Sequence, residues 1–92
     1  MEPFAIHLFI SRESATYHYV KRQVEIACTK AFGETHYRLR VIDIAERPDL
    51  AEKNNIEALP TVVIGGRRFI GAPDPETFAD FLSSVPGEPN CR

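Results

Sequence analysis

Residues 56–71 of this chain read IEALPTVVIGGRRFIG and contain two short β-rich runs, Thr61 to Ile64 and Arg67 to Ile70. Gly65-Gly66 joins the two runs, and glycines in a two-residue loop can adopt the positive φ angles that a tight hairpin requires. Pro60 directly precedes the first run, where the missing amide hydrogen of a proline is tolerated. The pattern predicts a β-hairpin that is entered through a proline.

A strand, a helix and a second strand are predicted upstream of the hairpin. Phe4 to Ile10 is apolar except at His7, as expected for a central strand covered on both faces. Ser14 follows as a candidate N-cap. Apolar side chains then recur at helical spacing at Tyr17, Val20, Val24, Ala27 and Ala31, with Cys28 beside this stripe. The alternation from Tyr37 to Ile44 predicts a strand that lies parallel to the first, because a helix connects the two.

Two shorter helices complete the predicted order β-α-β-α-β-β-α. One begins near Pro48, and the other begins at Asp74-Pro75 with an apolar face of Phe78, Phe81 and Leu82. This order predicts an α/β, thioredoxin-like fold with a mixed four-stranded sheet and helices on both faces. In that fold the Leu59–Pro60 peptide bond is cis. We expect a single domain over residues 1–92, with its core at about 5–84 and a disordered tail at 86–92.

Composition narrows the classes of partner. The 92 residues are 43% apolar, which suits one small domain, and carry a net charge of -2 with a pI near 5.9. This charge balance gives no basic footprint for nucleic acid or anionic membrane. The longest apolar run is too short to cross a bilayer, and the N-terminus lacks the pattern of a signal peptide. These features predict a cytoplasmic protein.

The turn before the first helix distinguishes catalysis from binding. Thioredoxin-like enzymes carry C-x-x-C or C-x-x-S there, whereas this chain has Ser14-Ala15-Thr16-Tyr17. A hydroxyl cannot replace the thiolate of such a site. The two cysteines, Cys28 and Cys91, match no zinc or redox motif, and the three histidines lack ligand spacing. We therefore expect no enzymatic activity, no catalytic residue, no metal and no cofactor.

A groove for a partner is predicted between the turn after the first strand and the turn that contains Pro60. Backbone groups before such a proline can pair with an extended peptide or with glutathione, in the manner of a strand. Pro60 is assigned as the structural cis-proline. The predicted partner-binding residues are Ser11, Ser14, Tyr17, His18, Leu59, Pro60 and Thr61.

Five short segments of the sequence indicate a particular protein family. They are LFI at 8–10, LRVIDI at 39–44, RPDLAE at 47–52, ALPT at 58–61 and RRFIG at 67–71. Together they resemble the KaiB family of circadian clock proteins and the related N-terminal sensor domain of the clock kinase SasA. The resemblance covers roughly residues 5 to 84.

The resemblance implies a non-enzymatic protein that binds the hexameric ATPase KaiC and switches between a tetrameric and a monomeric thioredoxin-like fold. Clock KaiB proteins carry a longer, proline-rich segment where this chain has Gly65-Gly66, so we do not carry fold switching over. The expected function is a KaiB-like protein-interaction module in clock-related or stress signalling. Its implied partners are a KaiC-like ATPase or a related signalling protein, with homo-oligomerisation left open and neither nucleic acid nor membrane. The alternative is a glutaredoxin-like or glutathione-binding redox protein that has lost the C-x-x-C motif.

Overall fold

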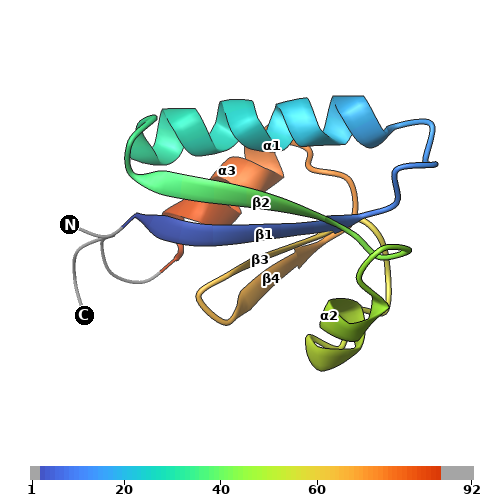
Figure 1. The fold of residues 1–92 in the computed structure, drawn as a ribbon. Coiled ribbons are helices and arrows are strands. Elements are labelled where there is room, and N and C mark those ends of the chain that lie inside the picture. Colours follow the sequence, from blue (N-terminus) through green and yellow to red (C-terminus); the bar gives the residue numbers. More distant parts are fainter. Residues whose placement is uncertain (1–2, 86–92) are drawn as a thin grey trace.

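A computed structural model describes residues 3–85 of the chain. The elements follow the predicted order: β1 (Phe4–Ile10), α1 (Tyr17–Phe32), β2 (Tyr37–Asp43), α2 (Pro48–Lys53), β3 (Thr61–Ile64), β4 (Arg67–Ile70) and α3 (Pro75–Ser83) (Figure 1). The predicted tail at 86–92 lies outside the described residues. None of the helices within residues 3–85 has the length and apolar character needed to cross a membrane.

The four strands form one mixed sheet in the order β2-β1-β3-β4. β1 and β2 are parallel, which confirms the strand–helix–strand unit, and β3 runs antiparallel to both β1 and β4. The Gly65-Gly66 turn closes the predicted hairpin, with φ angles of 54° and 85°. Successive positive φ angles give the turn the right-handed twist of the flanking strands.

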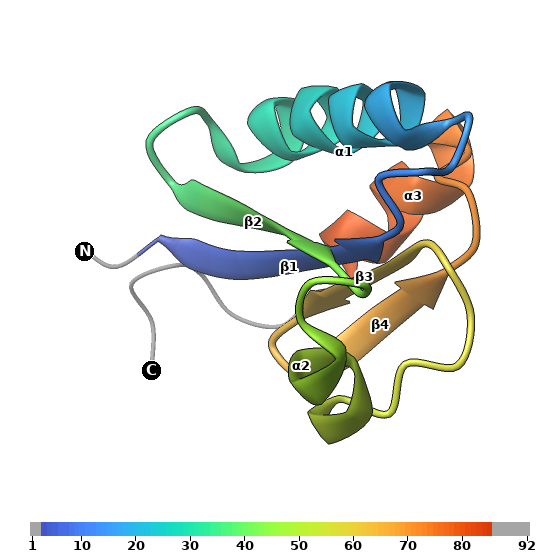
Figure 2. The ribbon, with the colours of Figure 1, turned by 45° about the vertical axis from the view of Figure 1, so that its right-hand side comes forward.

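Helices α1 and α3 cover one face of the sheet and form the core with it (Figure 2). Ile6, Leu8 and Ile10 of β1 are buried there, together with Val20 and Val24 of α1 and Phe78 and Leu82 of α3. Cys28, which the sequence placed beside the helical stripe, is fully buried, whereas Ala31 is exposed, so the predicted stripe is wrong at Ala31. Steps of four residues from Val20 lead to Val24, Cys28 and Phe32, and Ala31 falls at the margin of this face.

The opposite face of the sheet is covered only near one end, where α2 lies (Figure 1). Phe9 is fully buried there, but His7 is half-buried and Ala5 is exposed. The expectation that β1 is covered on both faces is therefore wrong for most of its length. The six residues of α2 span ~9 Å, against ~23 Å for the seven residues of β1.

Candidate functional site

The predicted groove residues belong to two segments at the same end of the sheet. β1 ends at Ile10 where β3 begins, since Phe9 pairs with Thr61 in the antiparallel register. The connection from β1 to α1 and the segment that leads into β3 therefore leave the sheet together (Figure 2). The topology brings residues 11–18 and residues 59–61 to one end of the molecule.

The Leu59–Pro60 peptide bond is cis, and Leu59 presents an open backbone beside it. The carbonyl oxygen of Pro60 accepts a hydrogen bond from the amide of Gly71 at 2.9 Å, whereas no hydrogen bond joins the backbone of Leu59 to another described residue. The N–H and C=O of Leu59 therefore have no hydrogen-bond partner among the described residues. Leu59 as a whole residue is 38% exposed.

Thr61 contributes to this turn from the inside. Its side chain is buried, and its hydroxyl donates a hydrogen bond to the carbonyl oxygen of Ala58 at 2.7 Å. A buried hydroxyl with a satisfied donor stabilises the turn in place. The Thr61 side chain thus supports this turn from inside and does not lie on its surface.

Ser14 is not the N-cap of α1, which corrects the prediction from the sequence. The N-cap is Thr16, and its side chain makes no capping hydrogen bond. Ser14 lies in a preceding turn, where its Oγ accepts from the amide of Thr16 at 3.3 Å and its carbonyl oxygen accepts from the amide of Tyr17 at 3.1 Å. The helix therefore begins two residues later than predicted, because the side chain of Ser14 hydrogen-bonds to the nearby backbone in this turn.

Tyr17 and His18 lie at the start of α1 with different exposures. Tyr17 is half-buried and packs against the core, while His18 is exposed. The two rings meet edge to face with centroids 5.0 Å apart. No hydrogen bond joins Ser14 to His18 among the described residues, so the pair does not form a nucleophile and its base.

Cys28 lies in the core, away from the start of α1 where a redox thiol would be placed. Burial raises the pKa of its thiol to about 12. The thiolate is the reactive form of cysteine, so this side chain is inert at neutral pH. Residues 3–85 also contain no group of three or more His, Cys, Asp or Glu side chains that could hold a metal ion.

One polar contact at this end of the sheet, between Arg12 and Asp43, was not predicted from the sequence. Arg12 Nε lies 4.0 Å from Asp43 Oδ2, and Asp43 Oδ1 accepts a hydrogen bond from the amide of Ala45 at 3.0 Å. Asp43 pairs with Ile10 in the parallel register, which places its side chain beside the chain leaving β1. The two residues are far apart in sequence, and only the register brings them together.

Several solved structures share the fold. The N-terminal domain of SasA from Synechococcus elongatus superposes with a TM-score of 0.72 at 21% identity, covering 89% of this chain and 81% of that one. Mitochondrial thioredoxin 3 from Saccharomyces cerevisiae gives a TM-score of 0.73 at 18% identity, covering 92% and 81%. Chloroplastic thioredoxin z gives 0.70 at 21% identity, covering 89% and 77%. At these identities the likeness establishes the thioredoxin-like fold.

Sequence comparison identifies the family within this fold. No curated protein matches the chain. The KaiB domain matches residues 7–74, a region that runs from β1 to the N-cap of α3 and includes both turns of the predicted groove. The chain therefore belongs to the KaiB domain family.

Proposed function

We propose that this protein is a non-catalytic interaction module that binds a KaiC-type ATPase in the cytoplasm and acts in clock-related or stress signalling. The observation that carries the proposal is the KaiB domain match across residues 7–74, in a chain with no cysteine between Ser11 and Tyr17. The resemblance to the clock family supplies the class of partner.

The chemistry of the chain supports binding without catalysis. The start of α1 offers the hydroxyls of Ser14 and Thr16, which bond to each other at 3.1 Å. The only cysteine among residues 3–85 is Cys28, which is buried in the core. Dithiol exchange requires an accessible thiolate beside a second thiol.

The geometry of the groove supports contact with a protein. Leu59 offers an exposed apolar side chain and a backbone that bonds to no other described residue. His18 offers an exposed ring held edge to face against Tyr17. An apolar anchor with adjacent polar groups is typical of the centre of a protein interface.

The test is size-exclusion chromatography with light scattering, on the protein alone and mixed with the KaiC-type ATPase from the same organism, with ATP or ADP. Co-elution with the ATPase ring is the expected result, and the run on the protein alone measures its oligomeric state. A separate peak in every nucleotide state would overturn the proposed partner.

The alternative is a glutathione-binding redox protein, favoured by the fold shared with thioredoxins and by the open backbone of Leu59. Reduction of a model disulfide with glutathione distinguishes the two functions. We expect no rate above background, and the variant Cys28→Ala/Cys91→Ser should bind the ATPase as tightly as the natural chain. Thiol-dependent reduction well above background would instead establish the redox function.

A further inference from the structure

The sheet face turned away from α1 and α3 is basic. The strand registers place ten residues on it: Arg38, Arg40 and Ile42 of β2, Ala5, His7 and Phe9 of β1, Thr61 and Val63 of β3, and Arg68 and Ile70 of β4. We call these residues the basic sheet face. They include three arginines, one histidine and no acidic residue, in a chain whose net charge is -2.

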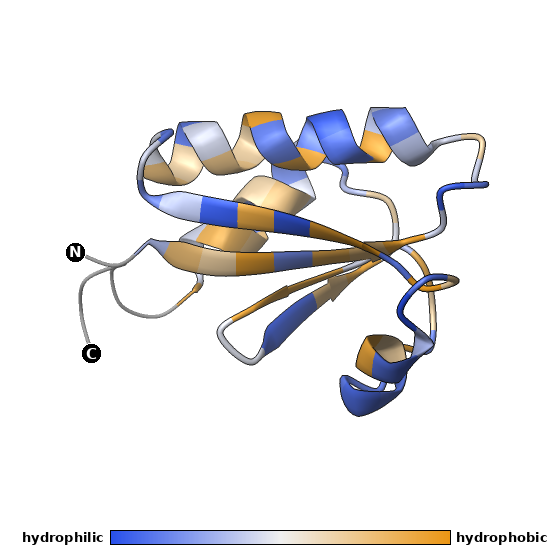
Figure 3. Ribbon diagram, in the orientation of Figure 1, coloured by the Kyte–Doolittle hydropathy of each residue, from blue (hydrophilic) through white to orange (hydrophobic). Residues whose placement is uncertain are grey.

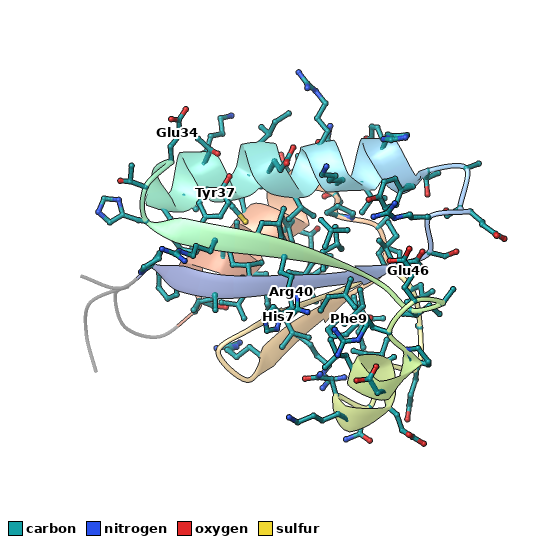
Figure 4. The ribbon with its side chains drawn as sticks, in the orientation of Figure 1. His7, Phe9, Glu34, Tyr37, Arg40 and Glu46 are labelled. Carbon is teal, nitrogen blue, oxygen red and sulfur yellow. The ribbon has the colours of Figure 1, made fainter. Side chains whose placement is uncertain are left out.

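Most of the basic sheet face is open. α2 covers the end at which Phe9 and Thr61 are buried, while Arg38, Arg40 and Arg68 are exposed. Figure 3 shows hydrophilic and hydrophobic residues alternating along β2, as expected for a strand with one face in the core and one in water. Figure 4 shows His7 and Arg40 side by side on this open face.

The positive charges on this face are not neutralised within the described chain. The ion pairs among residues 3–85 are Arg12–Asp43 and Arg47–Asp49, and neither involves the basic sheet face. Arg68 donates hydrogen bonds to the carbonyl oxygens of Asn54 at 2.8 Å and Asn55 at 3.1 Å, which fix its guanidinium but leave its charge without a carboxylate. Burial, and secondly the charge of Arg40, lower the pKa of His7.

Protection of sheet edges explains part of this pattern. β2 and β4 are the edge strands, and charged side chains on an edge discourage pairing with other chains. Edge protection works with charges of either sign, so it does not account for three arginines without a single carboxylate. The positive charge of this face is complementary to an anionic ligand.

The spacing of the face matches an extended acidic segment. Arg38 and Arg40 are two residues apart on one strand, which separates their Cα atoms by ~6.6 Å. Carboxylates at alternate positions of an extended chain have the same spacing. A nucleic acid fits less well, because the net charge is negative and Phe9, the aromatic residue of the face, is buried and cannot stack on a base.

We propose that the basic sheet face binds an acidic protein segment in which carboxylates alternate along an extended chain. This surface lies across the strands, whereas Leu59 and His18 of the predicted groove lie at the end of the sheet. The two sites can therefore be tested separately. The proposal that this face binds an acidic segment holds whether or not the partner at the other site is a KaiC-type ATPase.

The test uses fluorescence anisotropy with a labelled peptide of alternating glutamate and serine, about twelve residues long, which presents carboxylates at the spacing of two strand positions. The full-length protein is compared with Arg38→Gln/Arg40→Gln and with Arg22→Gln/Lys30→Gln. Both double variants lose two exposed positive charges, but Arg22 and Lys30 lie on α1, on the other side of the sheet. Circular dichroism verifies that both variants fold.

We expect the sheet variant to bind the peptide about fivefold more weakly or worse, and the α1 variant to stay within about twofold. Amide shifts on binding should fall on β1, β2 and β4, and affinity should fall as salt rises, because exposed charges are screened. A peptide of glutamine and serine should not bind. Failure of the acidic peptide to bind at low salt, or equal losses in both variants, would overturn the proposal. Tighter binding of a single-stranded oligonucleotide of the same length to these strands would assign the face to nucleic acid instead.

Discussion

His7 of β1 lies directly opposite Arg40 of β2 in the parallel register, on the sheet face that α1 and α3 leave open. The imidazole is half-buried and its ring lies edge to face with that of Phe9, with centroids 6.5 Å apart. Burial is the larger cause that lowers the pKa of His7 from 6.5, and the charge of Arg40 is the second. Both causes disfavour the imidazolium.

Arg40→Gln should therefore raise the pKa of His7 without restoring the ordinary value of 6.5, because burial remains. Titration of the imidazole by NMR measures this pKa directly. Arg22→Gln on α1 is the matched control, since it removes an exposed charge on the other side of the sheet. An unchanged pKa in Arg40→Gln would show that the guanidinium does not act on His7.

The same pKa makes the stability of the fold depend on pH. The unfolded chain has an ordinary histidine pKa near 6.5, and the folded pKa of His7 lies below it, so the unfolded state binds the proton first as the pH falls. This contribution to stability is fully present above pH 6.5 and is lost as the pH falls from there through the folded pKa. Denaturant titrations of the natural chain and of His7→Gln should differ in slope over that window, with the variant less sensitive to acid.

The two candidate helix caps should respond differently to alanine. Asp74 is the N-cap of α3, as the sequence predicted, and its carboxylate accepts from the amide of Thr77 at 3.2 Å and from its hydroxyl at 3.0 Å. Asp74→Ala should lower the free energy of unfolding by about 1 kcal/mol. Ser14→Ala should cost less, because Ser14 caps no helix and its contacts lie in an exposed turn. Equal costs in chemical denaturation would contradict this assignment.

The turn of the hairpin provides a second matched pair. Gly65 has φ of 54°, which asparagine adopts readily, whereas Gly66 has φ of 85°, and a Cβ at either position would meet no atom within 4 Å. Gly65→Asn should leave the free energy of unfolding nearly unchanged. Gly66→Ala should lower it by about 1–2 kcal/mol through backbone strain alone. Thermal and denaturant unfolding measure the stability of both variants. A large loss of stability in Gly65→Asn would argue against this turn geometry.

The order of the elements was predictable because each carried its own local signal. Gly65-Gly66 between two β-rich runs predicted the hairpin, and Asp74-Pro75 predicted the start of α3. The prediction that Ser14 is the N-cap of α1 was wrong because serine is common both at N-caps and in the turns that precede them. Which of the two it adopts depends on the path of the chain after β1.

The basic sheet face was not predictable in the same way. Arg38 and Arg40 follow the alternation of a strand, and taken by themselves they look like ordinary charged residues that face the solvent. They form a basic surface only together with His7 and Arg68, which lie on other strands. The strand register that places these residues on one face cannot be read from the sequence. The exposure of this face also depends on the shortness of α2, whose six residues cover only one end.

Cys28 should not react with a thiol reagent while the protein is folded. Burial raises the pKa of its thiol from 9.0 to about 12, so its thiolate fraction at neutral pH is about a thousandfold smaller than that of an ordinary cysteine. In a Cys91→Ser variant, Cys28 is the only thiol of the chain. Labelling with an aromatic disulfide should proceed only after denaturant is added, and rapid labelling of the folded variant would show that the core opens around α1.

Leu59 and Ile26 provide a matched test of the groove, since both are aliphatic side chains on the surface, with exposed fractions of 38% and 43%. Leu59 lies in the turn that leads into β3, whereas Ile26 lies on α1, beside a hollow of about 300 Å³ between α1 and α3. Truncation to alanine removes a similar amount of apolar surface from either site.

If the ATPase binds through the groove, Leu59→Ala should weaken binding about tenfold, as the loss of an apolar anchor does at the centre of an interface. Ile26→Ala should leave the affinity unchanged. Titration of each variant against the ATPase ring by interferometry or calorimetry gives both affinities under one nucleotide condition. If Ile26→Ala abolished binding and Leu59→Ala did not, the interface would instead lie at the hollow between α1 and α3. The chain would then bind the same partner through a surface that the backbone of Leu59 does not reach.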